Sequence, residues 1–165
     1  MGRGPCSGWA SALVVGSITG IALTVDRLPA RVASHFGAGG LANGFMTREI
    51  YLVFTIGMIV LPPALLALVI GASVRHFPQL LNLPNRDYWL AHERRDETAE
   101  YLLAHAAWLA ALLALLALGV HLLLIRANRA VPPRLDAGPF FAMLLAFLVA
   151  MTAWIGVLAR RFRRP

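Results

Sequence analysis

The densest group of side chains able to do chemistry lies in residues 92–100, where a histidine and several acids alternate with arginines. If this segment is helical, His92, Asp96 and Glu100 recur every four residues and share one face. An imidazole nitrogen and carboxylate oxygens at that spacing suit a divalent cation, so these three are weak candidates for a metal site. The alternative is structural, because acids at the start of a helix match the positive end of its dipole. We favour the structural explanation.

Two further histidines, His105 and His121, lie in one apolar stretch. A helix would separate them by about 24 Å, so they cannot share one metal or haem. Each is near an end of the stretch, where a neutral histidine bonded to backbone, water or a lipid headgroup is the simpler expectation. Ser-His-Asp arrangements, phosphate-binding glycine loops and HExxH patterns do not occur. The evidence for an enzyme is weak, and we predict no catalytic residue and no cofactor.

A second group of polar and aromatic residues lies in residues 26–49. Its proline and glycines favour extended structure and tight turns, and Asn43-Gly44 is a strong turn signal. We therefore expect an ordered loop, with a mixed polar and aromatic surface over residues 28–48 that is suited to binding. The alternative is a lid whose two phenylalanines are buried. The residues predicted to bind a ligand or partner are His35, Phe36, Asn43, Phe45 and Arg48.

The elements that position these residues follow from composition. Of the 165 residues, 59% are apolar and only 14% are charged, against roughly 25% in soluble domains. Four stretches are free of charged side chains and reach about 20 residues, the length that spans a bilayer as a helix. We predict one all-α membrane domain covering residues 1–165. Its four transmembrane helices are expected at about 8–25, 50–74, 101–125 and 137–159, and the first is expected to be retained rather than cleaved.

The arginines set the expected orientation. With four spans, both termini and the loop at residues 75–100 share one side and carry nine arginines, while the other side carries six. The positive-inside rule therefore places both termini in the cytoplasm and the loop at 26–49 outside. A net charge of +7 could suggest nucleic acid, but the arginines flank apolar blocks, so no nucleic-acid binding is expected. Anionic lipid is the expected partner of the tail residues Arg160, Arg161, Arg163 and Arg164.

The second predicted span carries Pro62-Pro63 near its middle. Proline lacks the backbone donor and leaves carbonyls of the preceding turn unpaired, so a kink or break is expected here. In transporters, broken helices with free carbonyls form ion or substrate sites. A small transporter or channel is therefore one alternative function. Against it, no carboxylate or arginine lies in the middle of any predicted span.

The loop at 26–49 also carries a family resemblance. Leu28-Pro29, Val32, His35-Phe36, Gly40, Asn43, Phe45 and Thr47-Arg48 together resemble the DUF1648 domain of bacterial polytopic membrane proteins. Ala127-Asn128 and the cytoplasmic-side segment at residues 82–95 fit members of that family with four spans. The resemblance implies an inner motif formed by Pro84, Asn85, Asp87, Tyr88, Trp89, Arg94 and Arg95, and it implies the bacterial cytoplasmic membrane as the location. The SdpI-like proteins are a distantly related group. Resemblance to them implies that such a scaffold can bind an extracellular peptide.

Three functions follow as hypotheses. The favoured one is a non-catalytic binding, sensing or partner-subunit protein that uses the outer loop, with a peptide or membrane protein as its partner. The second is a transporter or channel at Pro62-Pro63. The third is a metal-dependent interfacial enzyme that uses His92, Asp96, Glu97, Glu100 and His105.

Overall fold

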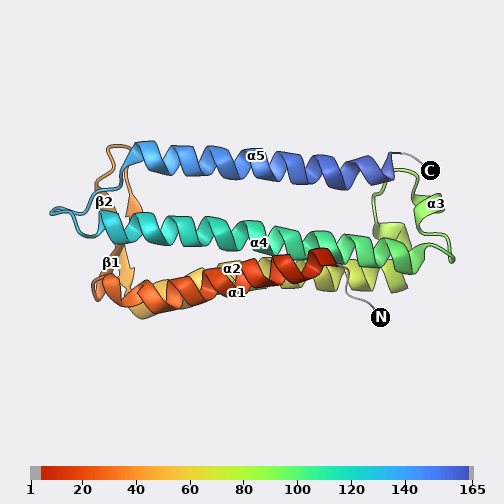
Figure 1. Cartoon of the computed structure of the whole chain (residues 1–165), viewed down its shortest axis with the longest axis horizontal. Coiled ribbons are helices and arrows are strands. Elements are labelled where there is room, and N and C mark those ends of the chain that lie inside the picture. The colour runs from red at the N-terminus through yellow and green to blue at the C-terminus, as the bar shows by residue number, and fades with distance from the viewer. Residues whose placement is uncertain (1–4, 164–165) are drawn as a thin grey trace.

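The computed structural model describes residues 5–163 and shows a bundle of four long helices (Figure 1). They are α1 (Pro5–Thr24), α2 (Arg48–His76), α4 (Arg95–Ala127) and α5 (Ala137–Phe162). Each is long and apolar enough to cross a membrane, and the most apolar stretch of each is at most 28% buried within the protein. Such outward-facing apolar surface requires lipid around it. The predicted four-span, all-α membrane fold is therefore confirmed.

The central helix of the bundle is α4, which packs along α1 and α2 on one side and along α5 on the other (Figure 1). In contrast, α5 lies along the outside of α4, and none of its most apolar stretch is fully buried. Three hydrophobic clusters are spaced along the bundle, around Tyr51 at one end, Ile59 in the middle and Phe162 at the other end. The two ends of the bundle are thus each closed by packed side chains.

One end of the bundle, the hairpin end, carries a two-stranded antiparallel sheet. After a short 3-10 turn, η1 (Val25–Arg27), strand β1 (Arg31–Phe36) pairs with β2 (Ala42–Thr47). The opposite end carries η2 (Pro78–Leu80) and α3 (Arg86–Trp89), and the start of α1 and the end of α5 point toward it (Figure 1). We call this second end the α3 end.

The structure corrects where the loop at the hairpin end reverses direction. The chain turns at residues 37–41, where the Gly37 N–H donates to the Leu41 carbonyl at 2.9 Å. Asn43 and Gly44, predicted to form a turn, lie instead within β2. A Cβ on Gly44 would lie only 3.0 Å from the His35 Cβ, so this glycine permits the close pairing of the strands. The predicted ordered loop is therefore a hairpin, but its turn comes earlier.

Two helix predictions also need correction. First, α2 is a single helix through Pro62-Pro63, so the predicted helix break is absent. Proline's fixed φ is compatible with a helix, and Pro63 is buried against neighbouring side chains, which holds the helix together despite the lost backbone bonds. Second, α4 begins at Arg95, so His92 lies in the preceding turn rather than on the helix.

Candidate functional site

The hairpin presents one face to the bundle and the other to the exterior. Val32 and Ala33 of β1 are fully buried, and Phe36 and Met46 pack against the cluster around Tyr51. Along β2, exposure alternates from residue to residue. Successive side chains of a strand point to opposite faces, so this alternation makes one face a packing surface and leaves the other free.

Asn128, just after α4, holds β1 in place through its side-chain amide. Its Oδ1 accepts the Ala33 N–H at 2.8 Å, and its Nδ2 donates to the Ala33 carbonyl at 3.1 Å and to the Leu124 carbonyl at 2.9 Å. A carboxamide offers both an acceptor and donors, so one side chain satisfies both backbone groups of Ala33. The strand is thereby fixed to the end of α4.

The segment after α4 also pairs with the hairpin turn. The Ala42 N–H donates to the Pro133 carbonyl at 3.2 Å, and the Leu135 N–H donates to the Gly40 carbonyl at 2.8 Å. Gly40 has a φ of 76°, and a Cβ there would lie 2.6 Å from the Leu135 carbonyl oxygen. Only glycine suits that position. We call residues 28–48, Asn128 and residues 133–135 the hairpin platform.

Arg48 anchors the far end of the hairpin, where β2 leads into α2. Its Nη1 lies 3.1 Å from Asp26 Oδ1, and its backbone N–H donates to the Ala30 carbonyl at 3.0 Å. The neighbouring Thr47 hydroxyl accepts the Ile50 N–H and caps α2. The start and the end of the hairpin are therefore tied to each other at the first turn of α2.

A buried polar group lies beneath the hairpin platform, between α1, α2 and α4. His121 is fully buried, with Nε2 2.9 Å from Thr24 Oγ1 and Nδ1 2.9 Å from the Tyr51 hydroxyl. The single Thr24 hydroxyl hydrogen is donated to the Gly20 carbonyl, so Thr24 accepts from Nε2–H and the Tyr51 hydroxyl donates to Nδ1. Both ring nitrogens of His121 therefore have partners, and these are side chains rather than the expected backbone, water or headgroup.

The free face of the platform combines apolar and cationic groups. Phe45 is 46% exposed and Leu41 is 52% exposed. The Arg31 guanidinium carbon lies 5.2 Å from the centroid of the Phe45 ring, close enough for a cation–π contact. Among the described residues, Arg31 forms no salt bridge, so its charge is available to a partner.

The five residues predicted for this loop divide into two groups. His35, Asn43 and Phe45 are exposed on the hairpin, and Ser34 Oγ lies 3.1 Å from His35 Nδ1. Phe36 packs inward and Arg48 is half-buried in its ion pair, so these two hold the platform together. Sequence reasoning missed Arg31, Leu41 and the role of Asn128, and only the resemblance of Ala127-Asn128 to the DUF1648 family hinted at the last.

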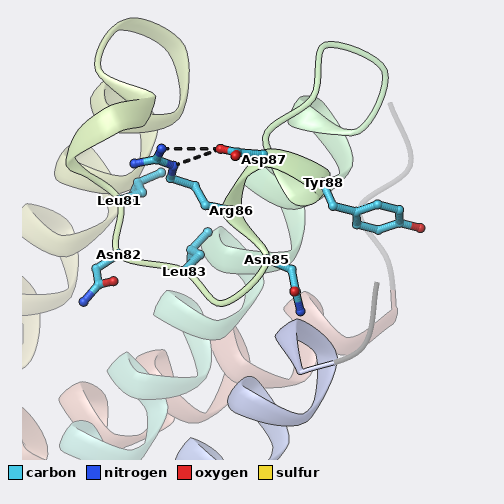
Figure 2. A pocket seen from close by; sticks show the side chains of 7 residues that line it. All are labelled: Leu81, Asn82, Leu83, Asn85, Arg86, Asp87 and Tyr88. Atoms are coloured by element: carbon cyan, nitrogen blue, oxygen red, sulfur yellow. Dashed lines mark hydrogen bonds and ion pairs between the residues drawn. The ribbon is translucent and has the colours of Figure 1, made fainter.

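The α3 end carries a shallow groove of about 510 Å³ (Figure 2). Asn85, in a left-handed conformation, points toward the end of α5, and its Nδ2 donates to the Phe162 carbonyl at 3.0 Å. Arg86 and Asp87 pair with each other at 3.3 Å on the surface. The groove is lined by Leu81, Asn82, Leu83, Asn85, Arg86, Asp87 and Tyr88.

The rest of the motif implied by resemblance holds local structure at the α3 end. The Arg94 guanidinium lies 4.0 Å from the Tyr88 ring centroid, and the Arg95 side chain donates to the Leu90 carbonyl. The Trp89 ring contacts Phe162 at 5.5 Å, and Pro84 is exposed. These contacts join the segment to α5 and α4.

An aromatic cluster lies beside this groove, between α4 and α5. The Arg161 guanidinium lies 4.3 Å from the Tyr101 ring centroid and forms an ion pair with Glu97. His105, the other histidine of that apolar stretch, lies between Tyr101 and Trp154 with its ring tilted by about 60° to both. Among the described residues, four buried polar atoms of this cluster lack a partner: Trp89 Nε1, His105 Nδ1, Trp154 Nε1 and Arg161 Nε. Three are donors only, so their partners would be acceptors from water or lipid.

Within residues 5–163, no group of three or more His, Cys, Asp or Glu residues is arranged to hold a metal ion. The weak metal candidates His92, Asp96 and Glu100 are therefore not brought together. All three are exposed, and His92 precedes the helix that carries the other two. Asp96 and Glu97 lie in the first turn of α4, as the dipole explanation requires.

Comparison with known proteins identifies one region of the chain. Residues 12–61 match the family described as "Domain of unknown function (DUF1648)". This segment covers most of α1, the hairpin and the first half of α2, and for these residues the DUF1648 resemblance predicted from the sequence is confirmed. The chain matches no curated protein and no solved structure.

Proposed function

We propose that this membrane protein, which carries a DUF1648 domain in residues 12–61, is a non-catalytic binding protein that holds a peptide or protein partner on its hairpin platform. The observation that carries the proposal is the half-exposed Phe45, paired with Arg31, on a hairpin whose backbone is fixed from three sides. The three sets of contacts that hold the backbone come from Asn128, from residues 133–135 and from the Asp26–Arg48 ion pair.

Rigidity of the platform supports binding rather than mere coverage of the bundle. A partner that docks on a preformed surface avoids the entropy cost of ordering a loop, which otherwise reduces affinity. A lid would bury both phenylalanines, but only Phe36 packs inward while Phe45 stays exposed. The platform therefore keeps one aromatic ring available for contact at no further ordering cost.

The chemistry of the free face indicates the partner. Phe45 and Leu41 offer apolar contact, and aromatic side chains and arginine are the residues most enriched at interface centres. Arg31 and the exposed Arg129 and Arg134 make this end basic. A peptide segment that places an apolar side chain next to a carboxylate complements both features.

The test uses site-specific photo-crosslinking in native membranes. A photo-reactive phenylalanine analogue at position 45 should form a discrete protein or peptide adduct. The same analogue at Val53, which is 72% exposed on the lipid-facing side of α2, should not. Arg31→Gln should weaken the adduct because the cation is lost, and Asn128→Ala should weaken it because β1 loses its clamp.

The outcome that overturns the proposal is an adduct pattern at position 45 identical to that at position 53, or an adduct insensitive to both substitutions. Adducts that contain only a second copy of this chain would assign the platform to self-association instead. The mass of the adduct identifies the partner, and its yield shows the effect of the two substitutions.

No observation favours the two alternative functions over this one. The groove of about 310 Å³ beside Pro63 is lined by apolar side chains, such as Val14, Ile59 and Ala106, so it offers an ion no ligand. Flux in vesicles that is abolished by replacing both prolines with alanine would nevertheless support a transporter. Stoichiometric metal that is lost in His92→Ala would support the enzyme.

A further inference from the structure

The outward side of α5 carries an apolar groove of about 690 Å³ that runs from Leu145 to Arg160. Its lining includes the small residues Ala153 and Gly156 and the larger Leu148 and Val157. Because none of the most apolar stretch of α5 is fully buried, this groove faces the surrounding lipid. The stretch from Leu148 to Val157 rises about 13 Å, close to the roughly 15 Å of one bilayer leaflet.

A single charged residue, Arg160, lines the groove at its end in the last turn of α5. Arg160 is exposed and, within residues 5–163, pairs with no carboxylate. Its neighbour Arg161 points about 100° away around the helix and is ion-paired with Glu97. The structure thus separates the arginines that the sequence groups together: Arg161 faces α4, Arg160 faces the groove, and Arg164 lies outside the described residues.

We propose that this groove is a binding site for one anionic phospholipid. An acyl chain lies along Leu148, Ala153 and Gly156, and the phosphate oxygens accept hydrogen bonds from the Arg160 guanidinium. Guanidinium and phosphate form strong, charge-assisted hydrogen bonds, and the arginine lies at the level where the acyl region ends. The site is separate from the hairpin platform, so the proposal does not depend on the proposed function.

A second copy of this chain is the competing occupant, and charge argues against it. A two-fold axis along the membrane normal would bring the α5 helices of two copies together at equal depth. The two unpaired Arg160 side chains would then face each other near the membrane surface. Like charges at close range are destabilising, whereas a phosphate in the same place neutralises the arginine.

The experiment measures lipid retention by native mass spectrometry on the full chain, purified in mild detergent with equal amounts of phosphatidylglycerol and phosphatidylcholine. The wild type should retain phosphatidylglycerol about fivefold better, because phosphatidylglycerol has a net charge of −1 whereas the choline of phosphatidylcholine neutralises its phosphate, and about 1 kcal/mol of attraction per arginine corresponds to that factor. Arg160→Gln should remove that preference. The matched control is Arg163→Gln, an exposed arginine three residues away that does not line the groove.

A second pair of variants tests the acyl part. A Cβ at Gly156 would meet no atom within 4 Å, so we expect Gly156→Leu to fill the groove while the bundle still folds, and it should reduce retention of both lipids. Gly16→Leu on the exposed side of α1 has the same open surroundings and should leave retention unchanged. Inorganic phosphate in millimolar excess should not displace the lipid.

Three results would overturn the proposal. If Arg160→Gln and Arg163→Gln reduced the preference for phosphatidylglycerol equally, the lipid would be attracted unspecifically to the basic tail. Displacement by inorganic phosphate, with no effect of Gly156→Leu, would mean a site for free phosphate. A dimer mass that disappears in Gly156→Leu would mean that a second copy occupies the groove.

Discussion

At the scale of single residues, two polar side chains stabilise the hairpin end: His121, which is fully buried, and Asn128, which is partly buried. His121 bonds to Thr24 and Tyr51, and Asn128 bonds to the backbone of Ala33, so each links two segments that are far apart in the sequence. In a membrane protein such bonds matter because lipid offers no replacement partner. His121 therefore supports the platform from beneath, and Asn128 holds β1 in place within it.

We predict that Tyr51→Phe lowers the stability of the bundle by about 1 to 3 kcal/mol, because His121 Nδ1 loses its only donor in a buried site. The measurement is thermal unfolding of the purified protein in detergent. Tyr88→Phe is the control, because Tyr88 lies at the α3 end and its hydroxyl has no bond among the described residues. Equal stability of the two variants would show that the His121 bonds are replaced by water.

At the scale of elements, the hairpin depends on two close approaches that side chains would prevent. Gly44 allows β2 to pass close to His35, and Gly40 allows the turn to pair with Leu135. Neither glycine is there for flexibility, since both lie in hydrogen-bonded segments. The free face of β2 keeps its orientation only while this register is kept.

Gly40→Ala should therefore loosen the hairpin, whereas Gly39→Ala should not. Alanine at position 40 must adopt a positive φ, which costs roughly 1 to 2 kcal/mol, and it also meets the Leu135 carbonyl. A side chain at Gly39 meets nothing within 4 Å. Hydrogen exchange at residues 31–47 in lipid nanodiscs measures the difference. Similar exchange in the two variants would contradict the proposed role of Gly40.

At the scale of the whole molecule, four spans place the two ends of the bundle on opposite sides of a membrane. The hairpin platform lies at one end, and the groove of Figure 2 lies at the other, with the end of α5. A ligand at the platform and a lipid at Arg160 would therefore act from different sides. Which side is cytoplasmic rests on the arginine count, which favours the α3 end.

Labelling of single cysteines tests that orientation. In a Cys6→Ser background, Asn43→Cys and Arg163→Cys should react with a membrane-impermeant maleimide from opposite sides of the membrane. Arg163→Cys should react only when the reagent has access to the cytoplasmic face. Leu145→Cys, which is exposed to lipid, is the unreactive control. Labelling of both positions from the same side would contradict the four-span topology.

The sequence located much of the candidate site. It did not show which of the side chains there face the bundle and which face outward. Proline, glycine and aromatic residues within residues 26–49 identified an ordered segment, because these types act locally on the backbone. The turn signal at Asn43-Gly44 and the break signal at Pro62-Pro63 were equally local, and neither the turn nor the break is present. Pairing of β2 with β1 outweighed the turn preference of Asn43-Gly44. Packing around the buried Pro63 outweighed the tendency of proline to break the helix.

By itself, the sequence determined that the chain has four spans. Their number depends on the length and composition of continuous stretches, since transfer into lipid is a sum over each segment. The family of residues 12–61 was recognised from individual motif residues. Only the tertiary structure decided that Phe36 faces inward and Phe45 outward, that Asn128 clamps β1, and that Arg160 and Arg161 have different surroundings. These depend on which distant segments meet, and hydropathy does not encode that.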